Sequence, residues 1–363
     1  MPMERKEFIK KLIMYGGAGL FMLSGGSLLL QACAPQAGRN EETVDEVWRP
    51  AYAKLAAQGE LEDRVNMFYK IMESCELCPR RCRVNRLEGE RGFCQAPGKA
   101  VVYSHQPHFG EELPLVGQRG SGTIFFSNCN LRCVFCQNWP IAHLGWGSTV
   151  SDEELADMMI NLQVMGCHNI NLVTPTHVLP NIVGAVKIAL EKGLHIPLCY
   201  NTSGYELVSI IKMLDGIIDI YLPDLKFMDG VEAERYNLAA AYDYPEKAMQ
   251  SIAEMHRQVG DMVTNKENIA LSGLMIRHLV MPNRVAGTED FTRWVADNLS
   301  TETYVNIMAQ YRVEYKAFEY EEIARAITTE EFVEAIEWAR DAGLTNLDQR
   351  SLAQYEIRKT LVD

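Results

Sequence analysis

The sequence from Ser127 to Asn138 reads Ser-Asn-Cys-Asn-Leu-Arg-Cys-Val-Phe-Cys-Gln-Asn, which places Cys129, Cys133 and Cys136 at C-x3-C-x2-C spacing. One loop of this length can hold three thiolates on a single inorganic cluster. A cubane of four irons and four sulfides normally takes four cysteine ligands, so three leave one iron able to take an outside ligand. A zinc loop or an incidental group of cysteines is the alternative. The spacing predicts a 4Fe-4S cluster with one open iron, where chemistry can occur.

Length and composition limit the classes of protein to consider. A chain of 363 residues that is 47% hydrophobic is long enough for one large α/β domain with extensions. A formal net charge of -13 argues against a nucleic-acid-binding surface, since phosphate contacts need concentrated Lys and Arg. We therefore expect a small molecule or a protein as the substrate, and no nucleic acid partner.

Residues 1–33 have the layout of a signal peptide. Basic residues precede an uncharged apolar run from Leu12 to Leu30, which ends in Leu30-Gln31-Ala32-Cys33. This ending resembles a bacterial lipobox, in which the cysteine becomes the lipidated first residue after cleavage. The run is also about long enough to cross a membrane as an uncleaved helix. The sequence predicts an exported, membrane-anchored lipoprotein lipidated at Cys33, with a cytoplasmic protein as the alternative.

A second group of cysteines occupies the region from residue 73 to 119, after a linker and helix expected at residues 34–72. Cys75, Cys78, Cys82 and Cys94 have C-x2-C-x3-C-x11-C spacing. Four thiolates form a closed set with no open position, which indicates a structural or electron-relay site rather than a catalytic one. Zinc and a second iron–sulfur cluster both suit this set, and a disulfide pair is a third option. The short spacings favour metal over disulfides that close long loops.

Strand and helix patterns alternate through residues 120–315, followed by a C-terminal helical region at residues 316–363. We expect strands at residues 123–126, 169–173, 196–200, 217–222, 274–280 and 304–308. We expect helices at residues 151–166, 179–192, 205–214, 232–259 and 291–298. About six strand–helix units predict an α/β fold with a parallel sheet and outer helices, and such folds place active sites at the carboxyl ends of the strands.

Polar side chains follow several of these strands. Thr174 comes after the second strand, and Asn201, Thr202 and Ser203 after the third, where an Asx-type turn is the alternative explanation. Asp224 and Lys226 alternate along an extended segment, so both can point into the barrel; an exposed charge pair is the alternative. His177 could be a general base or substrate contact, or could cap the next helix. Arg277 lies in an apolar strand and needs an anionic partner.

The cluster loop, with Phe135 just before its last cysteine, resembles that of the radical S-adenosylmethionine (SAM) superfamily. Residues 77–86, Leu-Cys-Pro-Arg-Arg-Cys-Arg-Val-Asn-Arg, match an element of one branch, the uncharacterised relatives of the pyruvate formate-lyase activating enzymes. The resemblance runs from about Cys75 to the carboxyl terminus. It implies a partial (β/α)6 radical SAM barrel with an N-terminal cysteine-rich extension.

This resemblance also implies cofactors and roles. The 4Fe-4S cluster at Cys129, Cys133 and Cys136 would bind SAM at its open iron and cleave it to a 5'-deoxyadenosyl radical, which abstracts hydrogen from a protein or small-molecule substrate. A low-potential electron donor would supply the electron. The expected SAM contacts are Thr174, Asn201, Thr202, Ser203, Asp224, Lys226 and Arg277. One departure is that no carboxylate follows the second strand, where the family usually has a Gly-Gly-Glu type motif.

A second class of function stays open beside the enzyme. The characterised relatives make a glycyl radical on a partner enzyme, and a different radical modification is equally compatible. The alternative is a metal-binding lipoprotein without turnover, acting in electron transfer or binding. The missing carboxylate and the export-like leader favour that alternative, because export removes the domain from SAM and low-potential donors. Asp224, Lys226 and Arg277 favour the enzyme.

The lipobox interpretation has a direct test. Cells that express the full chain should incorporate labelled palmitate into it, and Cys33→Ala should abolish the incorporation because the acceptor thiol is lost. Soluble, full-length, unlabelled protein in both cases would contradict lipidation.

Overall fold

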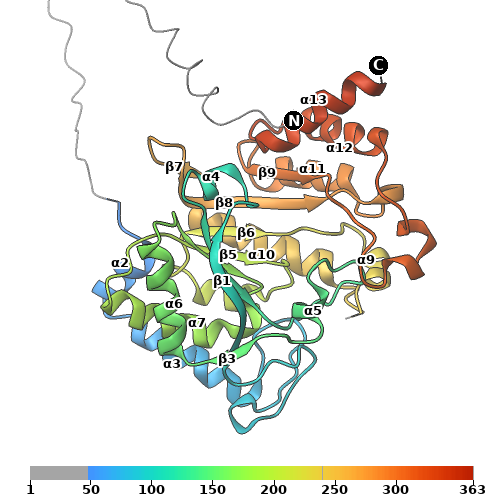
Figure 1. Cartoon of the computed structure of the whole chain (residues 1–363). Coiled ribbons are helices and arrows are strands. Elements are labelled where there is room, and N and C mark those ends of the chain that lie inside the picture. Colours follow the sequence, from blue (N-terminus) through green and yellow to red (C-terminus); the bar gives the residue numbers. More distant parts are fainter. Residues whose placement is uncertain (1–47, 239, 363) are drawn as a thin grey trace, which may run out of the picture. The chain divides into compact units, whose positions relative to one another are not determined.

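The computed structural model describes residues 48–238 and 240–362 (Figure 1). The leader expected at residues 1–33, its Cys33 and the first part of the expected linker lie outside the described residues. Within the described residues, no helix combines the length and the apolar character needed to cross a membrane.

Six parallel strands form the centre of the described sheet. Each pairs in parallel with the next, in the order β2, β4, β5, β6, β8 and β9. Their bounds are β2 Ser121–Phe126, β4 Ile170–Val173, β5 Leu198–Thr202, β6 Ile220–Pro223, β8 Ala270–Leu279 and β9 Tyr304–Met308. Strands β5 and β6 are buried along their whole length, as strands covered on both faces should be. The expected mixed α/β fold with a parallel sheet is confirmed.

Helices connect these strands in sequence. They are α6 Asp152–Val164, α7 Leu179–Glu191, α8 Val208–Met213, α9 Gly230–Tyr236, α10 Tyr244–Val259 and α11 Thr288–Asn298. Helix α6 begins with a capping box: the Ser151 hydroxyl accepts from the Glu154 amide at 3.2 Å, and the Glu154 carboxylate accepts from the Ser151 amide at 2.7 Å. Figure 1 shows α6 beside α7, and α10 packs on β6 and β8.

Two further helices, α2 Ala51–Ala57 and α3 Leu61–Ile71, precede the cysteine-rich region. Helix α3 packs on α7. The Tyr69 hydroxyl donates to Asp152 at 2.5 Å, and the Asn181 amide donates to the same carboxylate at 3.2 Å. These contacts join the N-terminal helices to the helices that cover the sheet.

The structure corrects several of the expected boundaries. The helix expected at residues 232–259 is two helices, because Asp229 caps α9 and a separate helix with Pro245 in its first turn starts at Tyr244. The helix expected from residue 205 begins only at Val208. Three antiparallel strands were not expected: β1 Ala100–His108, β3 Ser148–Val150 and β7 Val263–Thr264. Strand β1 pairs with β2 and β3, and β7 pairs with β8.

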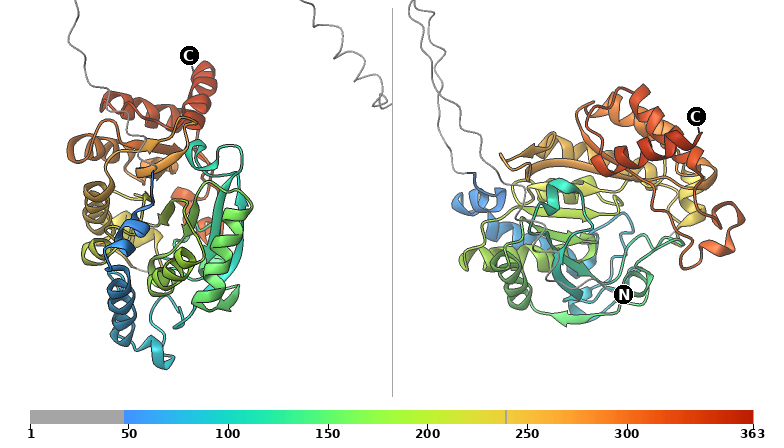
Figure 2. Two further views of the ribbon diagram at one scale, coloured as in Figure 1. Left: turned by 90° about the vertical axis from the view of Figure 1, so that its left-hand side faces the viewer. Right: turned by 45° about the horizontal axis from the view of Figure 1, so that its top comes forward.

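The C-terminal region is helical, with α12 Thr329–Asp341 and α13 Gln349–Val362 side by side (Figure 2). The remaining short helices lie in connections: α4 Leu113–Val116, α5 Trp139–Ala142, η1 Met72–Ser74, η2 Arg86–Glu88, η3 Thr176–Val178, η4 Pro282–Arg284, η5 Ala317–Glu319 and η6 Glu321–Ile323. The loop after β2 follows the carboxyl end of that strand, whereas α4 packs near the amino end of β4, where the Leu115 carbonyl accepts from Asn169.

Candidate functional site

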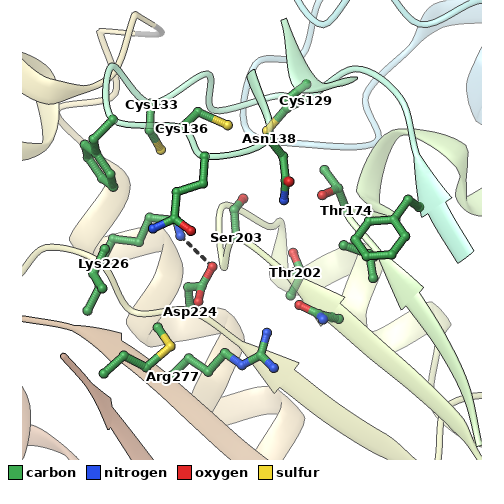
Figure 3. Close-up of a pocket in the computed structure, with 18 of the residues that line it drawn as sticks. Cys129, Cys133, Cys136, Asn138, Thr174, Thr202, Ser203, Asp224, Lys226 and Arg277 are labelled. Carbon is green, nitrogen blue, oxygen red and sulfur yellow. Dashed lines mark hydrogen bonds and ion pairs between the residues drawn. The ribbon is translucent and has the colours of Figure 1, made fainter. Parts of the chain in front are cut away.

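A pocket of about 390 Å³ lies at the carboxyl ends of the parallel strands (Figure 3). Its volume is in the range of sites that hold a small molecule or cofactor. The structure brings all of the residues expected at the cluster and at SAM into the lining of this one pocket: Cys129, Cys133, Cys136, Thr174, Asn201, Thr202, Ser203, Asp224, Lys226 and Arg277.

The cluster loop is held in place by backbone contacts. The Val134 amide donates to the Tyr236 carbonyl, and the Val134 carbonyl accepts from the Lys316 amide, both at 2.9 Å. Phe135 packs against Phe227 and Tyr311. The loop is therefore fixed by the last residue of α9 and by the segment after β9, so its three thiols have a defined place at the pocket.

The thiols of this loop are in surroundings that suit a positively charged cluster. Burial raises the pKa of the Cys133 thiol and brings the pKa of the Cys136 thiol to about 12. Without a compensating charge they would keep their protons, whereas bound iron deprotonates a coordinating thiol. The Leu131 amide also donates to the Cys129 sulfur at 3.4 Å, as amides do to iron–sulfur ligands. The residues present thus fit a cluster.

Lys226 and Asp224 form a close ion pair inside the pocket. The Lys226 ammonium donates to Asp224 at 2.5 Å, and each side chain is about one-fifth exposed, 18% and 20%. Burial alone would lower the pKa of Lys226, but the charges of Asp224 and Cys133 raise it. Figure 3 shows the two side chains pointing toward one another below the cluster loop. A permanent positive charge therefore faces the pocket close to the cluster cysteines.

Arg277 has anionic partners within the chain. Its Nε and Nη2 donate to the two oxygens of Glu112 at 2.7 and 2.6 Å, and Nη2 also donates to Glu111 at 2.6 Å. Asn306 donates to the same Glu112 carboxylate at 2.7 Å. The sequence predicts SAM as the anionic partner of Arg277, and no local pattern indicates either glutamate.

His108 and Glu111 extend the hydrogen-bond network of Arg277 along the pocket wall. His108 Nδ1 lies 2.7 Å from a Glu111 oxygen, and both residues line the pocket. Although burial opposes ionisation of Glu111, the hydrogen bond with His108 and the charge of Arg277 lower its pKa to about 2. The same hydrogen bond raises the pKa of His108. Neither residue was expected: His108 ends β1, a strand that the sequence pattern does not indicate, and Glu111 lies in the connection after it.

Thr174 is in a strained conformation at the pocket wall. Its φ of 60° is in the left-handed region, which a β-branched residue rarely adopts. The hydrogen bond from its amide to the Asn201 carbonyl, at 2.9 Å, ties the end of β4 to the end of β5. Strain of this kind persists only where the surroundings enforce it and is common at ligand sites.

His177 does not line this pocket, and the N-cap of α7 is Val178. The His177 side chain is buried, and its Nε2 donates to the Ser127 carbonyl at 2.7 Å. Burial lowers the pKa of His177 to about 4, which keeps the imidazole neutral. Neither role considered from the sequence matches this position.

Glu206 is a fully buried carboxylate beneath Thr202. One of its oxygens accepts from Thr176 at 2.6 Å, Thr202 at 2.5 Å and Tyr200 at 3.2 Å. Burial raises the pKa of Glu206 more than these hydrogen bonds lower it, so the pKa is about 7. Glu206 follows β5 rather than β4 and does not line the pocket, so it does not replace the carboxylate missing after the second strand.

The other cysteine set lines a separate pocket. Cys75, Cys78, Cys82 and Cys94 are all free thiols, and they share this pocket with Arg80, Arg86 and His177. Nowhere in residues 48–238 and 240–362 do three or more His, Cys, Asp or Glu side chains have the arrangement of a single-ion site. An iron–sulfur cluster requires a different arrangement of the cysteine side chains, because they ligate different irons rather than one ion.

Comparisons with known proteins agree with the site. A family model described as the radical SAM superfamily matches residues 123–264. The uncharacterized protein MJ0674 of Methanocaldococcus jannaschii is 35% identical over 295 residues, which cover 78% of this chain and 79% of that protein. The uncharacterized protein MJ0808 of the same organism is 33% identical over 96 residues, 22% of this chain and 28% of that protein.

Solved structures give weaker matches. The structure described as native anSMEcpe with bound AdoMet has 14% identity and a TM-score of 0.39, with coverage of 59% of this chain and 57% of that chain. Methylornithine synthase (PylB) has 15% identity and a TM-score of 0.39, with coverage of 62% and 69%.

The raised pKa of Glu206 predicts a pH-dependent stability. The ordinary pKa of a glutamic acid is 4.5, and in the folded protein that of Glu206 is about 7. Between these two pH values the unfolded chain releases the Glu206 proton while the folded chain keeps it, so the free energy of unfolding falls as the pH rises. The fall is about 1 kcal/mol per pH unit. In Glu206→Gln, which cannot titrate, the thermal unfolding midpoint relative to the unsubstituted protein should rise between pH 5 and pH 7.5. The exposed Glu191→Gln serves as the control, and a difference that is constant with pH would contradict the assignment.

Proposed function

This chain belongs to the radical SAM superfamily, and we propose that it reductively cleaves SAM and uses the resulting radical to abstract hydrogen from a substrate. The supporting observation is that the three cysteines of the loop and the seven expected SAM contacts line one pocket. Cys129, Cys133 and Cys136 would hold a 4Fe-4S cluster, which supplies an open iron and the electron for cleavage when it is bound.

The protein groups around the pocket match the charges of SAM. The Lys226 ammonium would pair with the SAM carboxylate, because it lines the pocket and its charge acts on the Cys133 and Cys136 thiols. Ser203 lines the pocket with a buried hydroxyl that has no hydrogen-bond partner among the described residues. A buried hydroxyl without a partner is costly, so a ligand that bonds to it gains affinity. Asn201 and Thr202 would position the rest of the cofactor from the same strand end.

Arg277 keeps a role at SAM in this proposal, although its main partners are glutamates. Glu111 and Glu112 occupy Nε and Nη2, which fixes the plane of the guanidinium. Its Nη1 has no hydrogen bond to the described residues and can face a ligand. Held this way, Arg277 loses little side-chain entropy when a ligand binds.

We place the substrate beside Met308 and Gln310, at the end of β9, where the pocket wall is formed by residues that the SAM contacts do not use. The chemistry we propose is similar to that of an activating enzyme, with hydrogen taken from a protein or a small molecule. A low-potential one-electron donor would supply the electron. The resemblance of residues 77–86 to the branch element supports this assignment.

Anaerobic reconstitution of the full chain in mild detergent tests the proposal. After dithionite reduction, addition of SAM should shift the electron paramagnetic resonance (EPR) signal, and chromatography should detect 5'-deoxyadenosine. Cys133→Ala should abolish the nucleoside because the cluster loses a ligand. Cys167→Ala, which removes a buried thiol outside both cysteine sets, should leave it unchanged.

A loop cluster that is indifferent to SAM, with no 5'-deoxyadenosine in the unsubstituted protein, would rule out the enzyme. The chain would then be a metal-binding protein that acts in electron transfer or binding.

Lys226 provides a sharper test of the SAM pose. Loss of one charge-assisted hydrogen bond, worth roughly 1.5–3 kcal/mol, should raise the SAM dissociation constant of Lys226→Met about 10- to 100-fold. The iron content should not change. Equilibrium dialysis of the reconstituted protein with labelled SAM measures the effect, with the exposed Lys212→Met as control. Equal affinity in the two variants would show that Lys226 does not contact SAM.

A further inference from the structure

The pocket of the four cysteines contains buried donors that lack acceptors. Arg80 Nε and Nη2 and Arg86 Nε have no hydrogen-bond partner among the described residues, and both arginines line the pocket. The Arg86 residue is only 2% exposed. An unsatisfied buried N–H of a charged group is strongly unfavourable, so these donors indicate that an acceptor-rich anionic group belongs here.

The identity of that group follows from the number of acceptors. A zinc ion on four thiolates adds no acceptor, because the ion itself accepts nothing. An iron–sulfur cluster adds inorganic sulfides, which accept hydrogen bonds in addition to the thiolates. The thiolates already have donors of their own: the Phe93 amide lies 3.4 Å from the Cys82 sulfur, and Arg86 Nη1 lies 3.9 Å from the Cys75 sulfur. The remaining guanidinium N–H groups are better matched by sulfides than by zinc.

Phe93 connects this pocket to the cluster loop. Its amide contacts the Cys82 sulfur, and its ring lies under two guanidinium groups, 4.5 Å from Arg80 and 5.7 Å from Arg132. Arg132 directly precedes Cys133 in the loop and lines the SAM pocket. Residues next to a ligand in each set therefore touch each other.

A second connection runs through His177. Arg86 Nη1 contacts the Cys75 sulfur and donates to the His177 carbonyl at 2.8 Å. The His177 ring donates to the carbonyl of Ser127, two residues before Cys129. The two cysteine sets are thus joined by two independent short paths of packed or hydrogen-bonded groups.

We propose that Cys75, Cys78, Cys82 and Cys94 hold a redox-active iron–sulfur cluster that delivers electrons to the cluster at Cys129, Cys133 and Cys136. An external low-potential one-electron donor reduces the four-cysteine site. That site passes one electron to the loop site, where the electron is consumed as the carbon–sulfur bond of SAM breaks to methionine and the 5'-deoxyadenosyl radical. The relay rests on the proposed function, whereas the identity of the metal does not.

The decisive variant removes only the loop ligands. The full chain with Cys129→Ala, Cys133→Ala and Cys136→Ala, reconstituted anaerobically, should retain iron and acid-labile sulfide in equal amounts, at least about two of each per chain. It should also show an EPR signal after dithionite reduction. About one zinc per chain without iron, or no metal at all, would overturn the proposal.

The unsubstituted protein keeps the test valid if this variant does not fold. It should contain about six to eight irons and negligible zinc, since the loop cluster accounts for four of the irons. About four irons together with one zinc per chain would assign zinc to the four-cysteine site and refute the proposal.

An electron relay requires the two sites to be close enough to interact magnetically. In the fully reduced unsubstituted protein, the EPR signal of the four-cysteine site should relax faster at a given microwave power than in the triple variant, because a second paramagnet is near. Identical relaxation in the two proteins would overturn the relay. The metal analysis and the EPR relaxation do not depend on SAM cleavage. Failure to form 5'-deoxyadenosine would therefore contradict the proposed function and leave the metal assignment separately testable.

Discussion

Charge compensation around the thiols of the cluster loop is the constraint on which the site depends. Burial raises the pKa of Cys133 and Cys136, so these thiols lose their protons when bound iron supplies positive charge. The Lys226 charge lowers both pKa values in part, and Lys226 itself needs Asp224, because an unpaired buried ammonium would lose its proton. The backbone of Asp224 pairs with that of Arg277 in an isolated β-bridge, and the Arg277 charge is balanced by Glu111 and Glu112. Signs thus alternate across the pocket from the cluster loop to β1.

This alternation explains why the pocket is assembled from distant elements. Each new charge introduces a desolvation cost that the next residue offsets, and the charges come from three segments: the connection after β6, strand β8 and the connection after β1. The residues that close the series, Glu111 and Glu112, lie immediately before α4 and reach Arg277 across about half the chain, 166 and 165 residues away. A parallel sheet makes this possible, because its carboxyl ends all meet at one edge. The antiparallel strand β1 pairs His108 with Ser121 at the amino end of β2, and His108 lines the pocket from there.

The sequence could predict what depends on local pattern and could not predict what depends on distant pairing. Cys spacing, the polar residues after the strands, and the alternation of Asp224 with Lys226 are visible within short windows. Strand β1 was missed because Pro107 and polar residues interrupt its apolar pattern, yet it is stabilised by pairing with β2. The partner of Arg277 was assigned to a ligand because nothing in the sequence links it to the two glutamates. The break between α9 and α10 depends on the Asp229 cap and on Pro245, which were not read as helix signals.

The relation between the two cysteine sets also exceeds what spacing can show. Cys94 and Cys129 are separated by β1, α4 and β2, so the sequence suggests an extension followed by a core. The structure instead packs Phe93 against Arg132 and places His177, from the connection after β4, between Arg86 and Ser127. The unpartnered guanidinium nitrogens of Arg80 and Arg86 belong to residues that line the same pocket as the four cysteines. The proposed electron relay would use these contacts, because they join the extension to the loop that would hold the SAM-binding cluster.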